Sequence, residues 1–190
     1  MSNKIKSAVP PYTSEEARAR ETFEALMWAF SYPGRTQKLP DDPNRIALIG
    51  DSLLDLETTF FTTDKPLIEL LKRTAARLMS PERAAYHFYP TVNAEALTAL
   101  ELAPVGTPQY PDEGATLVLG CTFGIGQQLT LRGPGIRGLQ TIYISGIPEA
   151  FWQLRAKTGI YPLGWDIFLV DPVGQLIGLP RTTHVREFEV

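Results

Sequence analysis

Two short runs of this 190-residue sequence carry side chains that could bind a small anion: residues 131–135 (LRGPG) and residues 180–184 (PRTTH). Four of their residues could donate charge-assisted hydrogen bonds to a phosphate or a carboxylate: Arg132, Arg181, Thr182 and His184. A structural alternative is that Arg181 pairs with a carboxylate such as Asp166, while the threonines cap backbone groups. We favour that structural interpretation of Arg181, and the anion site stays open beside it.

A glycine-rich run, residues 133–138 (GPGIRG), matches the G-x-G-x-x-G fingerprint of dinucleotide-binding sites letter by letter. That fingerprint works only where its glycines open a helix whose first amides meet a pyrophosphate. Here the following residues 139–145 (LQTIYIS) are rich in β-branched and aromatic side chains, which favour a strand. We therefore interpret the run as a turn between strands and predict no dinucleotide site.

Metal and nucleophile chemistry have little support in the sequence. The two histidines, His87 and His184, lie far apart, and the single cysteine, Cys121, cannot form a ligand pair of zinc-site spacing. No serine stands in a G-x-S-x-G elbow. We predict no metal site and no catalytic residue, and we interpret His87 as a strand histidine with one satisfied hydrogen bond.

Composition excludes several classes of function. A net charge of −3 provides no basic footprint for nucleic acid. The lone Cys121 excludes an intramolecular disulfide, lies in an apolar stretch and fits a buried thiol in a reducing compartment. No apolar run approaches the ~20 residues of a membrane span, and no signal-peptide pattern follows Lys4 and Lys6. We expect a cytoplasmic protein that contacts neither membrane nor nucleic acid.

The first half of the chain is predicted to be mostly helical. Residues 1–12, which end in two prolines, are expected to be a flexible tail, and residues 13–190 a single domain. Helices are expected from Thr13 or Ser14 to the Pro33-Gly34 stop, over residues 52–61, from Pro66 through Leu78, and over residues 93–100. Residues 84–89 alternate as a strand, while residues 45–50 (RIALIG) fit either a strand or the start of a helix.

The second half is predicted to be rich in strands. After a loop over residues 104–114, strands are expected over residues 115–123, 127–131, 139–145, 165–170 and 175–179, with one helix over residues 148–157. The first two of these strands flank Gly124 and Gly126, as in a hairpin. Helices followed by strands fit a single-domain, mixed-sheet α/β sandwich better than repeated βαβ units.

Five motifs in a fixed order carry a family resemblance. They are LMWAFSYPG (residues 26–34), GATLVL (114–119), LRGPGI (131–136), YPLGWDIFLV (161–170) and LPRTTHV (179–185). Together they resemble the PhnH family, the H subunit of the bacterial carbon–phosphorus lyase core complex, from about Glu15 to the C-terminus.

The resemblance implies a subunit that acts with partners of the G, I and J types in phosphonate breakdown. That assembly converts an alkylphosphonate and ATP into a ribose 1-alkylphosphonate 5-triphosphate and adenine. It also implies a fold like a reduced pyridoxal-phosphate-dependent transferase without the cofactor. In agreement, no lysine stands out as a Schiff-base former, and we expect no cofactor. The family brings no established catalytic residues.

Two functions remain open at this point. The first is an assembly subunit that forms a homodimer when alone. Plentiful aromatic residues support it weakly, because aromatics are enriched at interfaces but lie more often in cores: Trp28, Tyr32, Phe60, Phe61 and Trp152. The second is a substrate-handling subunit, or an independent small enzyme, that binds a phosphate through Arg132 and Arg181.

Overall fold

The computed structural model describes residues 13–187, so the tail expected over residues 1–12 lies outside the described residues. The α-helices of this part are α1 (Ser14–Ser31), α2 (Arg45–Leu53), α3 (Lys65–Leu71), α4 (Ala94–Leu100) and α5 (Glu149–Thr158). The strands are β1 (Gln37–Lys38), β2 (Thr59–Phe61), β3 (Arg77–Leu78), β4 (Tyr86–Tyr89), β5 (Thr116–Gly120), β6 (Thr122–Arg132), β7 (Gln140–Ser145), β8 (Asp166–Val170), β9 (Gln175–Leu179) and β10 (His184–Glu187). None of the described helices is long and apolar enough to span a bilayer.

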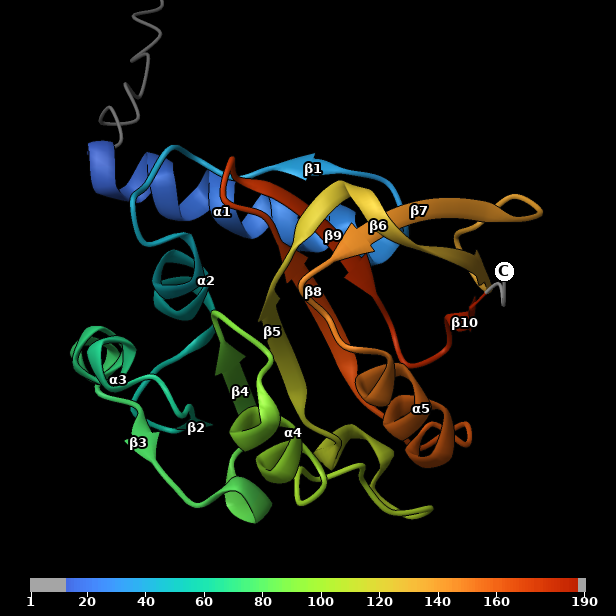
Figure 1. Cartoon of the computed structure of the whole chain (residues 1–190). Coiled ribbons are helices and arrows are strands. Elements are labelled where there is room, and N and C mark those ends of the chain that lie inside the picture. Colours follow the sequence, from blue (N-terminus) through green and yellow to red (C-terminus); the bar gives the residue numbers. More distant parts are fainter. Residues whose placement is uncertain (1–12, 188–190) are drawn as a thin grey trace, which may run out of the picture.

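The strands form two sheets (Figure 1). The larger has the order β1-β9-β8-β5-β4-β2-β3, in which the strands from β8 to β3 are parallel and β9 and β1 are antiparallel to their neighbours. The smaller sheet is antiparallel, with β6 between β10 and β7. The predicted mixed-sheet α/β class is confirmed, although the parallel run, with α4 joining β4 to β5, contains more βαβ character than we expected.

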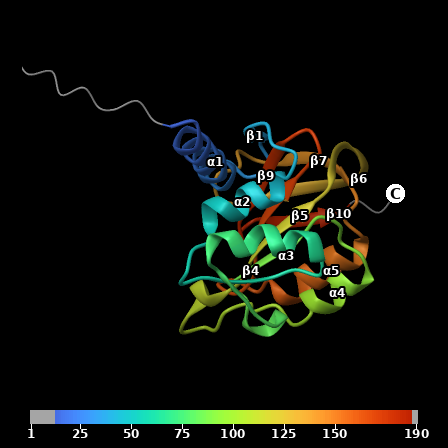
Figure 2. The ribbon, with the colours of Figure 1, turned by 90° about the vertical axis from the view of Figure 1, so that its left-hand side faces the viewer.

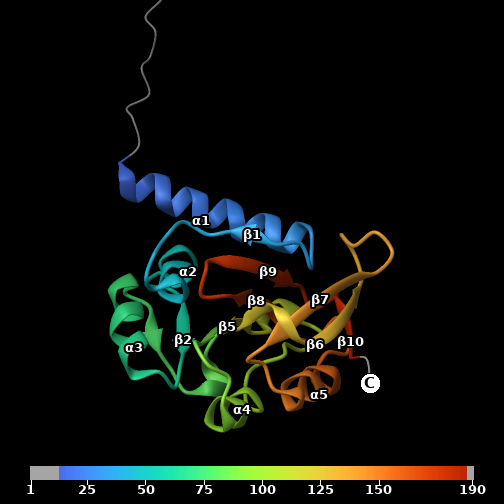
Figure 3. The ribbon, with the colours of Figure 1, turned by 45° about the horizontal axis from the view of Figure 1, so that its top comes forward.

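The larger sheet is covered on both faces. Helices α1, α2 and α3 pack on one face, and α4, α5 and the smaller sheet pack on the other (Figure 2 and Figure 3). Successive side chains of β5 point to opposite faces of the sheet, and those on both faces are apolar. Val118 packs in the layer with α1, α2 and α3, while Leu117 and Leu119 pack in the layer with α4, α5 and the smaller sheet. All three side chains are fully buried.

Helix α1 begins where the sequence predicts. The hydroxyl of Thr13 accepts a hydrogen bond from the backbone amide of Glu16 at 3.2 Å, and the Glu16 carboxylate accepts one from the Thr13 amide at 2.8 Å. This reciprocal pair is a capping box, which satisfies two amides that the helix itself leaves free. Further along, α1 lies directly on β9 because Gly178 has no side chain. A Cβ at position 178 would lie 2.6 Å from the carbonyl carbon of Ala29.

The helix expected over residues 52–61 is wrong. Residues 45–50 are helical and belong to α2, which ends at Leu53. The chain then turns at Asp55, whose carboxylate accepts hydrogen bonds from the amides of Glu57 and Thr58. The β-prone residues that follow form strand β2. The apolar spacing of residues 52–61 would allow a helix, but the hydrogen bonds from these two amides to the Asp55 carboxylate form a turn in its place.

Two further expectations are corrected. The helix expected from Pro66 through Leu78 is shorter: α3 ends at Leu71, a 3-10 turn follows over Lys72–Thr74 and ends at the left-handed Ala75 (φ 65°), and Leu78 lies in β3. The hairpin expected around Gly124 and Gly126 is absent, because β5 and β6 belong to different sheets and β6 pairs instead with β7 and β10. The two glycines lie at an irregularity in the register of β6 against β7.

Candidate functional site

Arg181 lies in the turn between β9 and β10 and is held by Asp166 at the start of β8. The Asp166 carboxylate accepts the Arg181 backbone amide at 2.8 Å and the guanidinium Nε and Nη2 at 3.1 and 2.6 Å. The third guanidinium nitrogen, Nη1, donates to the carbonyl of Pro111. The ion pair that we favoured from the sequence is confirmed, and it fixes the guanidinium within the protein.

Arg155 on α5 also holds this turn, a role that the sequence analysis did not predict. Its Nη2 donates to the carbonyls of Pro180 at 3.2 Å and Thr183 at 3.0 Å, at the two ends of the turn. Burial lowers the pKa of Arg155 to about 10, and the nearby charge of Asp166 opposes that shift, so the side chain is charged at neutral pH. The helical spacing from the buried Phe151 to Arg155 placed both on the inner face of α5 and was the available signal.

Arg132 and His184 are brought together by strand pairing. His184 on β10 lies directly opposite Arg132 on β6, and both side chains are exposed. The core-facing neighbour of Arg132 is the fully buried Leu131, so alternation directs Arg132 to the other face of the smaller sheet. Thr182 stays in the turn, where a Cβ on Gly133 would lie 2.8 Å from its carbonyl oxygen. The four expected residues thus separate into an exposed pair and a turn held by internal contacts.

The glycine-rich run of residues 133–138 connects β6 to β7, as the turn interpretation predicts. The backbone of Gly135 has a φ of +79°, and a Cβ there would lie 2.6 Å from the carbonyl oxygen of Ser31 at the end of α1. A Cβ on Gly34 would likewise lie 2.7 Å from Leu131 Cδ1. The turn is therefore built to lie against α1, and its glycines serve close backbone contact.

Segments distant in sequence also meet at Arg181. A Cβ on Gly114 would lie 2.5 Å from the carbonyl oxygen of Gly164 and 3.0 Å from Arg181 Nη1. The amide of Gly164 donates to the carbonyl of Val105 at 2.9 Å. The segments around residues 114, 164 and 181 therefore hold one another in place, and a substitution that moves one of them would displace the other two.

These segments lie within a region of the chain that matches known proteins. Residues 10–186 match the family described as Bacterial phosphonate metabolism protein (PhnH). This chain belongs to the PhnH family. HtxG of Stutzerimonas stutzeri, described as a proposed C-P lyase subunit, is 36% identical over 176 residues, which cover 89% of this chain and 86% of HtxG.

A second relative in the PhnH family comes from Rhizobium meliloti (strain 1021). It is described as the alpha-D-ribose 1-methylphosphonate 5-triphosphate synthase subunit PhnH. It is 29% identical to this chain over 183 residues, which cover 88% of the chain and 90% of the relative. Both relatives therefore span nearly the whole of the described fold.

The carboxyl ends of the parallel strands, where open α/β sheets commonly bind ligands, offer this PhnH-family chain little chemistry. A cavity of about 250 Å³ lies there, lined in part by Arg45, Pro90, Cys121 and Asp171. Burial, with a smaller contribution from the charge of Asp171, raises the pKa of Cys121 far above its ordinary value, so the thiol is protonated. Asp171 Oδ1 accepts two amides of the β8–β9 turn, and the described residues hold no cluster of potential metal ligands.

Proposed function

We propose that this chain is the H-type subunit of a carbon–phosphorus lyase complex in bacterial phosphonate breakdown, where it has a structural or assembly role. The complex would convert an alkylphosphonate and ATP into a ribose 1-alkylphosphonate 5-triphosphate and adenine. Membership of the PhnH family supports this, together with end-to-end similarity to a relative whose name states that synthase. The partners would be subunits of the G, I and J types.

One structural observation carries the assembly role. Arg181, in the motif of residues 179–185, holds Asp166 and Pro111, and the partly buried Arg155 holds the same turn. A catalytic site needs a nucleophile, a base and a group that orients the base, with room for a substrate between them. The described side chains around this turn instead contact one another, which suits a rigid scaffold.

The outer side of α1 is the surface that we propose for subunit contact. Among the aromatic residues expected at interfaces, Trp28 and Tyr32 are exposed and stacked with their ring centroids 5.5 Å apart, whereas Phe60 and Trp152 are buried in the core. Phe23 is also exposed, at 57%, but it lies on another side of α1, where it lines a cavity of about 500 Å³ with Met27 and Phe30. Exposed aromatic side chains such as the Trp28–Tyr32 pair are typical of interaction surfaces. Without its partner subunits, we expect the chain to cover this surface in a homodimer.

Three finer points belong to the same proposal. We propose that residues 13–190 form one domain, that the protein is cytoplasmic, and that the fold is a reduced pyridoxal-phosphate-dependent transferase fold that holds no cofactor. The mixed sheet with helices on both faces is compatible with that fold. Superposing the larger sheet on solved transferases of that fold tests this part of the proposal.

A second candidate function is the handling of a phosphate or phosphonate group. The exposed, adjacent side chains of Arg132 and His184 favour it. The sequence analysis grouped Arg181 with them, but its guanidinium is paired with Asp166 and is therefore less available to bind an anion.

Co-expression with subunits of the G, I and J types tests the assembly role. The chain should co-purify with them, and the purified chain alone should release neither adenine from ATP nor methane from methylphosphonate. Substituting Trp28→Ala should weaken co-purification, whereas the exposed Arg83→Ala, outside α1, should not. Turnover by the isolated chain well above a blank would overturn the proposal.

A further inference from the structure

The outer face of the smaller sheet carries a group of side chains that we call the basic face: Thr130, Arg132, His184 and Arg186. Leu129 and Leu131 on β6 are fully buried in the core, so the residues that alternate with them face away from it. In the register of β10 on β6, His184 lies opposite Arg132 and Arg186 lies opposite Thr130. The basic face therefore comprises two directly paired positions on adjacent strands.

The spacing of this face follows from strand geometry. Side chains directly opposite on antiparallel strands have Cβ atoms about 5 Å apart, and diagonal neighbours about 7–8 Å apart. Arg132 and Arg186 occupy one diagonal, and Thr130 and His184 occupy the other. Two guanidinium groups at that separation can reach one small anion held between them.

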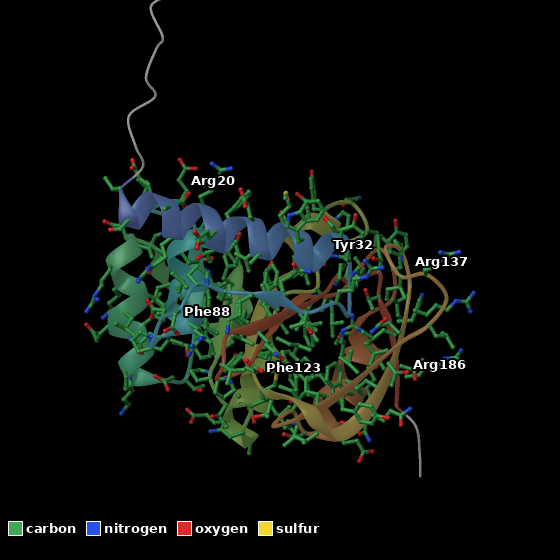
Figure 4. The ribbon with its side chains drawn as sticks, turned by 90° about the horizontal axis from the view of Figure 1, so that it is seen from above. Arg20, Tyr32, Phe88, Phe123, Arg137 and Arg186 are labelled. Atoms are coloured by element: carbon green, nitrogen blue, oxygen red, sulfur yellow. The ribbon has the colours of Figure 1, made fainter. Side chains whose placement is uncertain are left out.

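The positive charge of this face has no counterpart among the described residues. Neither Arg132 nor Arg186 forms a described ion pair, whereas Arg18, Arg45 and Arg181 each pair with an aspartate. Arg137, on the neighbouring β6–β7 turn, adds charge on the same flank of the molecule as Arg186 (Figure 4). Arg132 and Arg186 repel one another across their diagonal, so an anion bound between them would be stabilising.

Thr130 points to the kind of anion. It is only 8% exposed, and its hydroxyl oxygen is buried without a hydrogen-bond partner in the described part of the chain. A buried hydroxyl without a partner is costly, and an anion oxygen that displaced the atoms now covering it would satisfy it. Two guanidinium groups, an imidazole and a hydroxyl at four corners match the several oxygens of a tetrahedral oxyanion better than the two oxygens of a carboxylate.

We propose that the basic face binds the tetrahedral oxyanion of a phosphate or phosphonate group. Arg132 and Arg186 hold its oxygens from opposite corners, Thr130 donates its hydroxyl hydrogen from below, and His184 donates a ring N–H. The site uses Arg186 and Thr130, which the sequence reading did not include, in place of Arg181 and Thr182. It rests on the second candidate function, for which it names the site, and it is independent of the assembly role, because a scaffold subunit needs no such site.

Calorimetry on the full chain tests the site, with inorganic phosphate, methylphosphonate and ATP as separate probes at constant ionic strength. Arg132→Gln and Arg186→Gln should each weaken binding by about tenfold or more, because each removes charge-assisted hydrogen bonds. The isosteric Thr130→Val should weaken binding less while leaving the melting temperature unchanged or raised, because it removes an unsatisfied hydroxyl. Arg137→Gln is the matched control, since it removes the same charge from the adjacent turn and should retain most of the affinity.

The outcomes separate the sources of the anion. Tighter binding of ATP than of phosphate assigns a nucleotide, and tighter binding of methylphosphonate assigns a phosphonate, and either result supports the site. Absence of binding at millimolar concentrations of all three probes overturns it. So does an equal loss in Arg137→Gln and Arg132→Gln, which would mean that only net charge attracts the anion. Co-purification with partner subunits is a separate readout, so failure here leaves the assembly role standing.

Discussion

The carboxylate of Asp166 accepts three hydrogen bonds from the single residue Arg181, one from its backbone amide and two from its guanidinium. This arrangement joins the start of β8 to the turn that follows the end of β9 at Leu179. Both side chains are largely buried, with exposed fractions of 15% for Arg181 and 23% for Asp166. Their ion pair is therefore shielded from solvent to a degree that surface pairs are not.

Substituting Arg181→Ala should lower the free energy of unfolding by about 2–4 kcal/mol, because it leaves the Asp166 carboxylate without its charged partner. Urea denaturation measures the loss. In the double variant with Asp166→Asn, the second substitution should cost much less than it does alone, since the pair acts as a unit. Anion binding to the basic face should survive in Arg181→Ala. A variant with unchanged stability and abolished anion binding would reverse these roles.

Gly178→Ala should separate α1 from the sheet, because its new Cβ would lie 2.6 Å from the backbone carbonyl carbon and oxygen of Ala29. Overpacking of this kind costs about 1–3 kcal/mol. Hydrogen exchange gives a local readout, with amides of α1 exchanging faster in the variant. Gly124→Ala is the control, since a Cβ there has nothing within 4 Å, and its strain at φ +83° should leave exchange in α1 unchanged. Equal exchange in both variants would contradict the argument.

Parts of this structure with local causes were predictable from the sequence. The start of α1 follows from a capping box of Thr13 and Glu16, and its end follows from Pro33-Gly34. The pairing of Arg181 with Asp166 was also predictable, because an arginine close to a carboxylate in the fold commonly forms an ion pair with it. In each case the residues that decide the outcome are near in sequence or belong to a recurrent chemical pair.

Features that depend on strand register were not predictable. Arg186 joins Thr130 on the basic face only because β10 pairs with β6 in one register, and a shift by one residue would turn it to the other face. Strands β2 and β3 contain three and two residues, too few to give a period, and they were absorbed into expected helices. Both the basic face and the short strands β2 and β3 depend on pairing between distant segments, which no local sequence pattern indicates.

Cys121 should be nearly inert in the native protein. Burial raises the pKa of its thiol, and the charge of Asp171 raises it further, so at pH 8 almost none of it is the reactive thiolate. Ellman's reagent should react at least about a hundredfold more slowly with the folded chain than with the chain in urea, because reaction requires opening of the core. Comparable rates in the two states would mean that the thiol is accessible in the native fold.

His87 should make stability depend on pH in mild acid. The side chain is fully buried in β4, with Nδ1 3.1 Å from the hydroxyl of Tyr89. Burial lowers the pKa of His87 from 6.5 to about 4, although the carbonyls of Ala84 and Pro81 oppose the shift. At pH 7.5 and above the imidazole is almost wholly neutral in both the folded and the unfolded chain, so its contribution is nearly constant there.

As the pH falls from 6.5 towards 4, the unfolded chain takes up the proton first and the folded state loses stability. Over this window the loss assigned to His87 is about 3 kcal/mol, at roughly 1.4 kcal/mol for each pKa unit. Carboxylates also titrate in this range, so the variant His87→Gln serves as the reference that removes the imidazole alone. Urea denaturation at pH 7.5 and pH 4.5 should give a larger loss for the wild type than for His87→Gln. If both proteins lose the same stability, the imidazole is not held neutral by the core.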